Sequence, residues 1–223
     1  MLKYPCLVMD HDDTAVRSEE TVNYPEFLLT LHELRPGVEM SREDFTRWCF
    51  ERGYAAMVRE HLAFTDEEAD LAFRKWKAYV MTHMPPAYGG IREILQKHKA
   101  LGGMICVVSH SADANILRDY RSHFDLEPDL IYGWELGEEL RKPNPYPLLD
   151  IMEKTGFDAQ QLLMVDDLKP GYDMAKSCGV PFACAGWGHY LPEITDYMRK
   201  NCDYYFSTVQ EFSDFLFSDT SCS

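Results

Sequence analysis

The chain has 223 residues, of which 46% are hydrophobic, so it can bury the core of one large domain or of one domain with an insert. Its 22 basic and 37 acidic residues give a formal net charge of −15. A field of this sign repels nucleic acids and anionic membranes, and we expect neither as a partner. An anionic substrate would need local positive charge from a metal ion, a lysine or helix N-termini.

Targeting signals and cysteine pairs are not evident in the sequence. The first residues lead straight into an apolar run and lack the hydrophobic region of a secretory signal. No apolar run approaches the roughly 18–20 residues that a membrane span needs. The seven cysteines, at positions 6, 49, 106, 178, 184, 202 and 222, form no CxxC pair. These features predict a cytoplasmic protein with reduced thiols.

The first part of the chain combines one short strand with a long helical stretch. Residues 7–9 are apolar and predict a strand that ends abruptly at Asp10. From about residue 18 to residue 84 the pattern is helical, and no strand pattern interrupts it. Ser41 and Thr65 both precede acidic residues and predict helix N-caps, with a capping box at Thr65. This stretch is long enough to form a small helical domain.

Strands and helices alternate after Pro85-Pro86. The predicted strands are 104–108, 130–134, 162–165, 181–185 and 204–206, and the predicted helices are 91–100, 112–120, 146–155 and 172–178. This alternation predicts an α/β fold with a parallel, doubly wound sheet. We therefore expect residues 1–17 and 85–223 to form an α/β core domain and residues 18–84 to form an inserted helical domain.

Four polar segments follow, or closely trail, the ends of predicted strands. They are Asp10-His11-Asp12-Asp13-Thr14, Ser109, Lys142-Pro143-Asn144-Pro145 and Asp166-Asp167. Ligands of open parallel sheets bind outside the carboxyl ends of the strands. We therefore expect the four segments to converge on one crevice and to form a phosphoryl-transfer site.

The first segment contains the two carboxylates that such chemistry requires. Asp10 at the end of a strand can attack phosphorus and form an aspartyl-phosphate. Asp12 can protonate the leaving oxygen and later activate water. The D-x-D-x-T pattern taken alone fits the cap of the following helix equally well, so its position at a strand end decides for the functional interpretation.

The other segments predict a metal ion and a phosphate site. Asp166-Asp167 together with Asp10 would form an oxygen-rich site suited to Mg²⁺, whereas alone the pair would fit a solvated acidic turn. Lys142 precedes a stiff Pro-Asn-Pro frame, and its ammonium would neutralise both the phosphate and the nucleophile. Ser109 precedes a helix, where a hydroxyl and backbone N–H groups can bind an anion or simply cap the helix.

In this order the segments resemble the motifs of the haloacid dehalogenase (HAD) superfamily, along essentially the whole chain. Residues 10–14 match the first motif, D-x-D-x-T/V, and Ser109, Lys142 and Asp166-Asp167 match the second, third and fourth. The acidic pair with Gly171 and the helical insert are similar to the phosphoglycolate phosphatase and β-phosphoglucomutase branch. The resemblance implies a Rossmann-like core with a helical cap domain.

The resemblance also implies a role for each matched residue. Asp10 would be the nucleophile and a Mg²⁺ ligand, and Asp12 the acid/base that also lends its backbone carbonyl to the metal. Lys142 would anchor the phosphate and complete the catalytic set. Asp167 would be a metal ligand, and Asp166 would bind the metal directly or through water.

Further positions would bind phosphate or depart from the family pattern. Thr14 and Ser109 would hold the phosphate or support its loop, and His110 could face the phosphate rim. Asp13 stands where the family usually has glycine, and His11 replaces an apolar residue, which favours packing or a peripheral role. Arg17 could meet substrate, cap a helix or be solvated.

The resulting hypothesis is a Mg²⁺-dependent phosphatase that hydrolyses a small phosphomonoester through an aspartyl-phosphate. A phosphoglycolate-like or sugar-phosphate-like metabolite would be its partner. The alternatives are a β-phosphoglucomutase-like phosphomutase and a catalytically silent HAD-fold binding protein. The mutase pattern has histidine twelve residues after the nucleophile, where this chain has Val22, and the retained Asp12 argues against dehalogenase chemistry. The sequence names neither the substrate nor the oligomeric state; Tyr54, Arg59 and His61 are candidates for substrate selection.

Overall fold

The computed structural model describes residues 2–218, which divide into two compact units. Met1–Val16 and Ala87–Ser223 form one unit, here called the sheet unit. Arg17–Pro86 form the other, here called the helical unit. All four predicted motif segments belong to the sheet unit.

The sheet unit is built on a parallel sheet. Among the described residues it has six strands in the order β3-β2-β1-β4-β5-β6. The strands are β1 (Cys6–Met9), β2 (Met104–Val108), β3 (Leu130–Tyr132), β4 (Leu162–Asp166), β5 (Phe182–Ala185) and β6 (Tyr204–Phe206). β1 pairs with β2 on one side and with β4 on the other, so the order reverses between β1 and β4. The predicted doubly wound α/β sheet is confirmed, and this reversal is where such sheets bind ligands.

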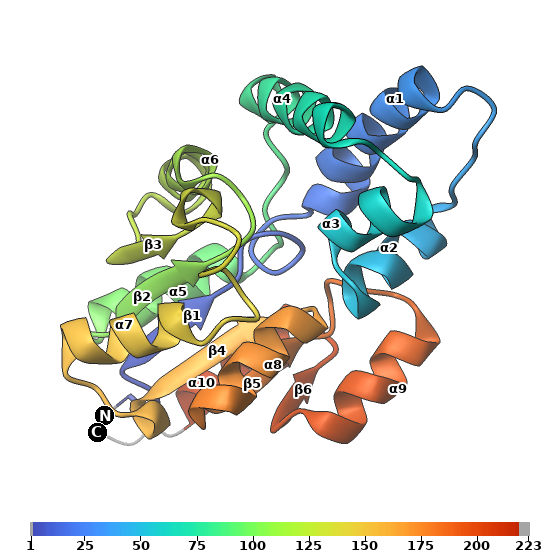
Figure 1. Cartoon of the computed structure of the whole chain (residues 1–223). Helices are drawn as coiled ribbons and strands as arrows, with labels where there is room; N and C mark the ends of the chain where they lie inside the picture. Colours follow the sequence, from blue (N-terminus) through green and yellow to red (C-terminus); the bar gives the residue numbers. More distant parts are fainter. Residues whose placement is uncertain (1, 219–223) are drawn as a thin grey trace. The chain divides into compact units, whose positions relative to one another are not determined.

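Helices cover both faces of this sheet (Figure 1). On one face, Leu7 and Met9 of β1 pack in an apolar core with α5 (Ile91–Ala100), α6 (Asp113–Asp119) and α10 (Val209–Phe217). The other face is covered by α7 (Tyr146–Thr155), α8 (Lys169–Cys178) and α9 (Pro192–Asn201). Because both faces are buried, the central strands are continuously apolar and do not alternate with polar residues.

The helical unit has a core of its own. Its elements are η1 (Glu19–Asn23), α1 (Tyr24–Leu34), α2 (Arg42–Glu51), α3 (Tyr54–Ala56), η2 (Met57–His61) and α4 (Asp66–Thr82). Phe27, Phe45 and Met57 are buried together at its centre. The caps expected at Ser41 and Thr65 are present: each side chain accepts a hydrogen bond from a backbone N–H three residues on, and Thr65 forms the full capping box with Glu68.

The structure differs from the predicted elements in a few places. The strand expected at 130–134 ends at Tyr132, because the chain turns at Gly133 and Trp134 N–H donates to the Ser111 carbonyl at 2.8 Å. Helix α8 begins three residues earlier than predicted, at Lys169, because proline fits the first turn of a helix. The sequence interpretation also left out α9 and α10.

The predictions about membrane spans and cysteines can be compared with the structure over residues 2–218. Within residues 2–218, no helix is long and apolar enough to cross a bilayer. The six cysteines of this range carry free thiols, and Cys222 lies outside the described residues.

Candidate active site

Three carboxylates meet at the carboxyl ends of β1 and β4. Asp10 directly follows β1, and its backbone N–H donates to the Val165 carbonyl of β4 at 2.8 Å. Asp166 ends β4 and Asp167 follows it. Oxygen atoms of Asp10, Asp166 and Asp167 lie within 4.8 Å of one another, and all three residues are buried. Two of the predicted motifs are thus brought together by the pairing of adjacent strands.

The Lys142 ammonium lies between two of these carboxylates. Its Nζ donates to Asp10 Oδ1 at 2.7 Å and to Asp166 Oδ2 at 2.5 Å. Lys142 is only 7% exposed, and the peptide bond to Pro143 is cis. A buried lysine held by two buried carboxylates has few other conformations, so its position relative to Asp10 is fixed.

The electrostatics of this cluster favour a further cation. Burial raises the pKa of Asp10 to about 7, and the neighbouring Asp166 and Asp12 add to the rise while Lys142 opposes it. Burial and the charges of Asp166 and Asp10 also raise the pKa of Asp167 well above its ordinary value. Three carboxylates face one ammonium, and hard oxygen ligands of this kind suit Mg²⁺. The residues present therefore fit the metal that the sequence predicts.

Asp12 is held by two hydroxyls from the loop after β2. Ser111 Oγ donates to Asp12 Oδ2 at 2.6 Å, and Ser109 Oγ lies 3.4 Å from the same oxygen. Ser109 Oγ also accepts from the Ser111 N–H at 3.2 Å. The structure thus joins the first and second motifs. Sequence interpretation gave Ser111 no role, because its contact with Asp12 joins residues far apart in the chain.

The loop after β1 bends tightly at Asp13. This residue has φ of 51°, in the left-handed region where glycine is favoured, which accounts for the glycine usual at this position. Thr14 is fully buried, and its hydroxyl lies 3.5 Å from Asp10 Oδ2. The Thr14 carbonyl accepts from Trp187 Nε1 at 3.0 Å. Thr14 therefore supports Asp10 and its loop.

Two glycines pack closely against the acidic residues. A Cβ on Gly171 would lie 2.1 Å from Asp166 Oδ2, at the start of α8. A Cβ on Gly188 would lie 2.0 Å from the Asp13 carbonyl oxygen. Neither Gly188 nor Trp187 could be assigned from the sequence, because both reach the site through the loop after β5.

The two histidines near the motifs occupy different environments. His110 is exposed, and its Nε2 lies 2.9 Å from the Lys142 carbonyl oxygen, so it contacts the segment that carries the lysine. Surrounding protein atoms and the positive charge of Lys142 lower the pKa of His110 to about 4. His11 is 1% exposed and contacts Asp119 of α6. Its packed position agrees with the interpretation made from the sequence.

The residues considered for substrate selection belong to the helical unit. Val22, which stands where the mutase pattern has histidine, is also buried there, and Arg17 is exposed. Tyr54 packs edge-on against Phe27 and Phe45 of this unit's core.

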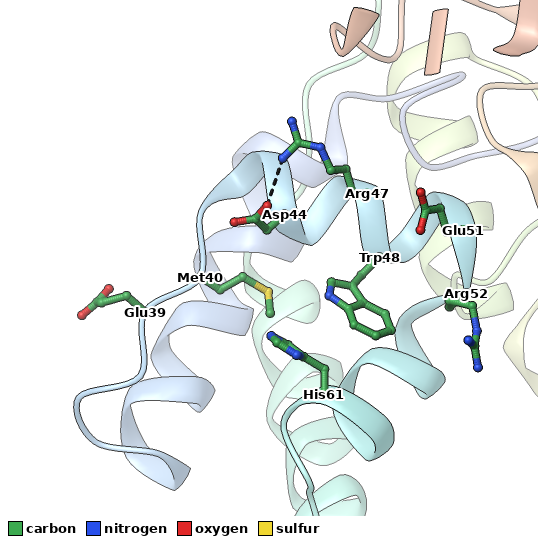
Figure 2. A pocket seen from close by; sticks show the side chains of 8 residues that line it. All are labelled: Glu39, Met40, Asp44, Arg47, Trp48, Glu51, Arg52 and His61. Carbon is green, nitrogen blue, oxygen red and sulfur yellow. Dashed lines mark hydrogen bonds and ion pairs between the residues drawn. The ribbon is translucent and has the colours of Figure 1, made fainter. Parts of the chain in front are cut away.

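His61 lines a pocket of the helical unit, about 480 Å³ in volume (Figure 2). Its ring stacks on Trp48 with ring centroids 5.1 Å apart. The pocket is lined by Glu39, Met40, Asp44, Arg47, Trp48, Glu51, Arg52 and His61.

Comparison with known proteins identifies the family. Residues 7–185 match the family of haloacid dehalogenase-like hydrolases. The chain belongs to this family. The match covers all four motif segments, so the predicted superfamily and its hydrolase class are confirmed.

Individual relatives lie in the predicted branch of the HAD family. A phosphoglycolate phosphatase of Rhodospirillum rubrum is 28% identical over 137 residues, which is 57% of this chain and 56% of that protein. The HAD chain thus matches just over half the length of this curated relative. A predicted phosphoglycolate phosphatase from Haemophilus somnus has a TM-score of 0.77 at 19% identity, covering 98% of this chain and 99% of its own.

A second solved structure extends the likeness of fold. CbbY of Rhodobacter sphaeroides, in complex with xylulose-(1,5)bisphosphate, has a TM-score of 0.74 at 16% identity and covers 95% of this chain and 96% of its own. At this identity the likeness shows the fold alone. The α/β HAD-like fold therefore extends over nearly the full length of both solved structures.

Proposed function

We propose that the protein is a Mg²⁺-dependent phosphatase that hydrolyses a small phosphomonoester through an aspartyl-phosphate on Asp10. The main support is the buried Lys142 ammonium, which bridges the proposed nucleophile Asp10 and the metal-site residue Asp166. An ammonium in this place can neutralise an arriving phosphoryl group while holding the attacking carboxylate in position. Family membership and the phosphatase relative add independent support.

In the proposed reaction, an Asp10 carboxylate oxygen forms a bond to phosphorus while the bond from phosphorus to the leaving oxygen breaks. Asp12 donates a proton to that oxygen, and later takes a proton from the water that attacks the aspartyl-phosphate. Ser111 and Ser109 hold one Asp12 oxygen, which leaves the orientation of the carboxyl group defined. Attack by water at phosphorus releases inorganic phosphate and restores Asp10.

Asp10, Asp166 and Asp167 are the proposed Mg²⁺ side-chain ligands, with the backbone carbonyl of Asp12 as a further ligand. Bound Mg²⁺ supplies positive charge that stabilises the oxygens of the phosphoryl group. Lys142 contributes the remaining positive charge. Thr14 and Ser109 support the carboxylates of Asp10 and Asp12, and His110 supports the Lys142 segment.

The proposed substrate class is a small phosphorylated metabolite, phosphoglycolate-like or sugar-phosphate-like, in the cytoplasm. The helical unit would act as the cap that selects the leaving group and excludes water. Its two connections are paired: Val16 bridges Ala87, and Arg17 N–H donates to the Pro86 carbonyl at 2.9 Å. Adjacent short connections of this kind could serve as a hinge.

The phosphomutase alternative has less support, because Val22 cannot perform the acid/base role of a histidine at that position. A silent binding protein is disfavoured because every proposed catalytic position is occupied. Turnover of a panel of phosphorylated metabolites and of p-nitrophenyl phosphate with Mg²⁺ distinguishes the phosphatase, phosphomutase and binding-protein hypotheses.

The phosphatase proposal predicts phosphate release that EDTA abolishes and that Asp10→Asn lowers by about 10³-fold or more. The control Asp214→Asn makes the same substitution at an exposed aspartate on α10 and should leave turnover unchanged. Isomerisation of a sugar phosphate without phosphate release would favour the mutase. No turnover of any compound would favour the binding protein.

A further inference from the structure

His11 separates the two catalytic aspartates in the sequence and is tied to a different element. Its Nε2 lies 3.1 Å from Asp119 Oδ2, at the end of α6. A carboxylate only accepts hydrogen bonds, so Nε2 carries the proton and donates. The second Asp119 oxygen accepts from Arg118 Nε at 2.6 Å. His11 and Asp119 are each 1% exposed, so this contact is fully within the core.

The backbone of His11 closes the loop that carries the catalytic aspartates. The His11 carbonyl accepts from the N–H groups of Ala15 at 3.0 Å and Val16 at 3.1 Å. His11 thus closes the loop through its backbone carbonyl. It also links the loop to α6 through its side chain. An apolar residue, which the family usually has here, could fill the same space but could not make the second connection.

Helix α6 follows the loop that holds Asp12. Ser111 Oγ donates to Asp12 at 2.6 Å, and α6 begins two residues later at Asp113. The nucleophile loop and the segment from Ser109 through α6 are therefore joined twice, by Asp12 with Ser111 and by His11 with Asp119. The second contact restrains rotation of the loop about the first.

We propose that His11 is a positioning residue, whose hydrogen bond to Asp119 holds the Asp10–Asp12 loop in the orientation needed for phosphoryl transfer. This inference rests on the proposed phosphatase function for its kinetic readout. Its structural content, a loop fixed to α6 through one side-chain nitrogen, can be measured separately.

His98 supplies a matched control. It is also a buried histidine at 1% exposure, and its Nε2 lies 3.3 Å from the Pro5 carbonyl oxygen. In His98 and in His11 alike, Nδ1 is buried without a hydrogen-bond partner in the described part of the chain. Pro5 directly precedes β1, so His98 lies at the opposite end of the strand that leads to Asp10. Its loss should affect stability without affecting the catalytic loop.

The test compares His11→Leu, His11→Asn and His11→Gln with His98→Leu. The Gln amide nitrogen reaches roughly where Nε2 lies, whereas the Asn amide corresponds to Nδ1. We expect the Leu and Asn variants of His11 to lower kcat for p-nitrophenyl phosphate by about tenfold to a hundredfold. KM should change by less than about twofold, and His11→Gln should stay within about threefold of the wild type.

Hydrogen exchange gives a readout that does not depend on activity. Amides of residues 10–16 should exchange faster in His11→Leu and His11→Asn than in the wild type, but not in His11→Gln or His98→Leu. Should His11→Leu fail to fold, the contrast of Asn with Gln decides. Equal kcat and equal loop exchange in the Asn and Gln variants would overturn the proposal, as would a His11→Leu variant that merely melts earlier, like His98→Leu. A wild type without turnover would reject the phosphatase function alone, because loop exchange still tests His11.

Discussion

Lys142 is the residue on which the charge balance of the site depends. It neutralises two buried carboxylates, Asp10 and Asp166, and no exposed lysine can do this from the surface. The sequence indicated its importance through the two prolines that follow it. The contact with Asp166 could not be predicted, because it depends on where the loop before α7 meets β4.

Replacing Lys142 by methionine should abolish most of the activity and also destabilise the fold. Two buried carboxylates would lose their counterion, and breaking a buried ion pair typically costs about 3–5 kcal/mol. Lys154→Met is the control, because the Lys154–Asp150 pair lies at the surface, with the lysine side chain 53% exposed. Such pairs contribute about 1 kcal/mol or less. Urea unfolding would measure the loss of stability in both variants, and equal losses would contradict the role of burial.

Gly171→Ala tests how closely α8 packs against the proposed metal site. Alanine is favoured over glycine in a helix by about 1 kcal/mol, so propensity alone predicts a more stable protein. The added Cβ would lie 2.1 Å from Asp166 Oδ2, which forces that carboxylate to move. We expect the steric cost to exceed the gain in helix propensity. The variant should then be less stable and be stabilised less by Mg²⁺ in thermal melts. Lys176→Ala, exposed on the same helix, should show neither effect.

Other site residues were beyond sequence interpretation for a common reason. Asp10, Asp12 and Asp166 were predictable because a strand end and an acidic pattern occur together in a few residues. Ser111, Gly188 and Asp119 contribute through contacts with residues far away in the chain. No local pattern encodes such contacts.

Elements were predicted well where periodicity and end signals agreed. Helices α5 and α7 have the predicted bounds, and glycine follows α7 at Gly156 in the left-handed conformation. Helix α10 was missed although Thr208 and Glu211 form a capping box and five of the nine helix residues are apolar. The end of β3 was placed too late because a tertiary contact to Ser111 determines it.

The capping box of α4 permits a test at this scale. Thr65→Ala removes the side-chain oxygen that accepts from the Glu68 N–H at 3.2 Å, which should lower the stability of the helical unit by about 1 kcal/mol. Thr82→Ala at the other end of α4 loses exposed hydrogen bonds to the Tyr79 carbonyl and to His83 Nδ1 and should stay within about 0.5 kcal/mol of the wild type. Denaturant unfolding measures the stability of both variants. An equal loss of stability in the two would contradict the stabilising role of the Thr65 cap.

At the scale of the whole molecule, the described chain divides into two compact units, and the insertion of residues 18–84 as a cap domain stays a prediction. Whether the helical unit closes over the site is part of the proposal. Small-angle scattering with and without Mg²⁺ and a phosphate analogue would detect closure as a smaller radius of gyration. Identical profiles in both conditions would count against a mobile cap.

Metal binding should also stabilise the whole molecule. Clustered carboxylates repel one another when ionised, and a ligand that binds only the folded state adds about 2.7 kcal/mol at a hundred times its Kd. We expect the melting temperature to rise with Mg²⁺ for the wild type, and Asp167→Asn to lose most of this rise. A rise of equal size in both proteins would indicate binding elsewhere.

The proposed reaction forms a covalent bond between the Asp10 carboxylate and phosphorus. Borohydride reduces an aspartyl-phosphate to homoserine, so quenching turnover with borohydride and mapping peptides by mass spectrometry locates the nucleophile. We expect homoserine at position 10, only when substrate and Mg²⁺ are both present, and none at Asp12, Asp166 or Asp167. Turnover that proceeds with modification at another residue, or with no trapped residue at all, would contradict it.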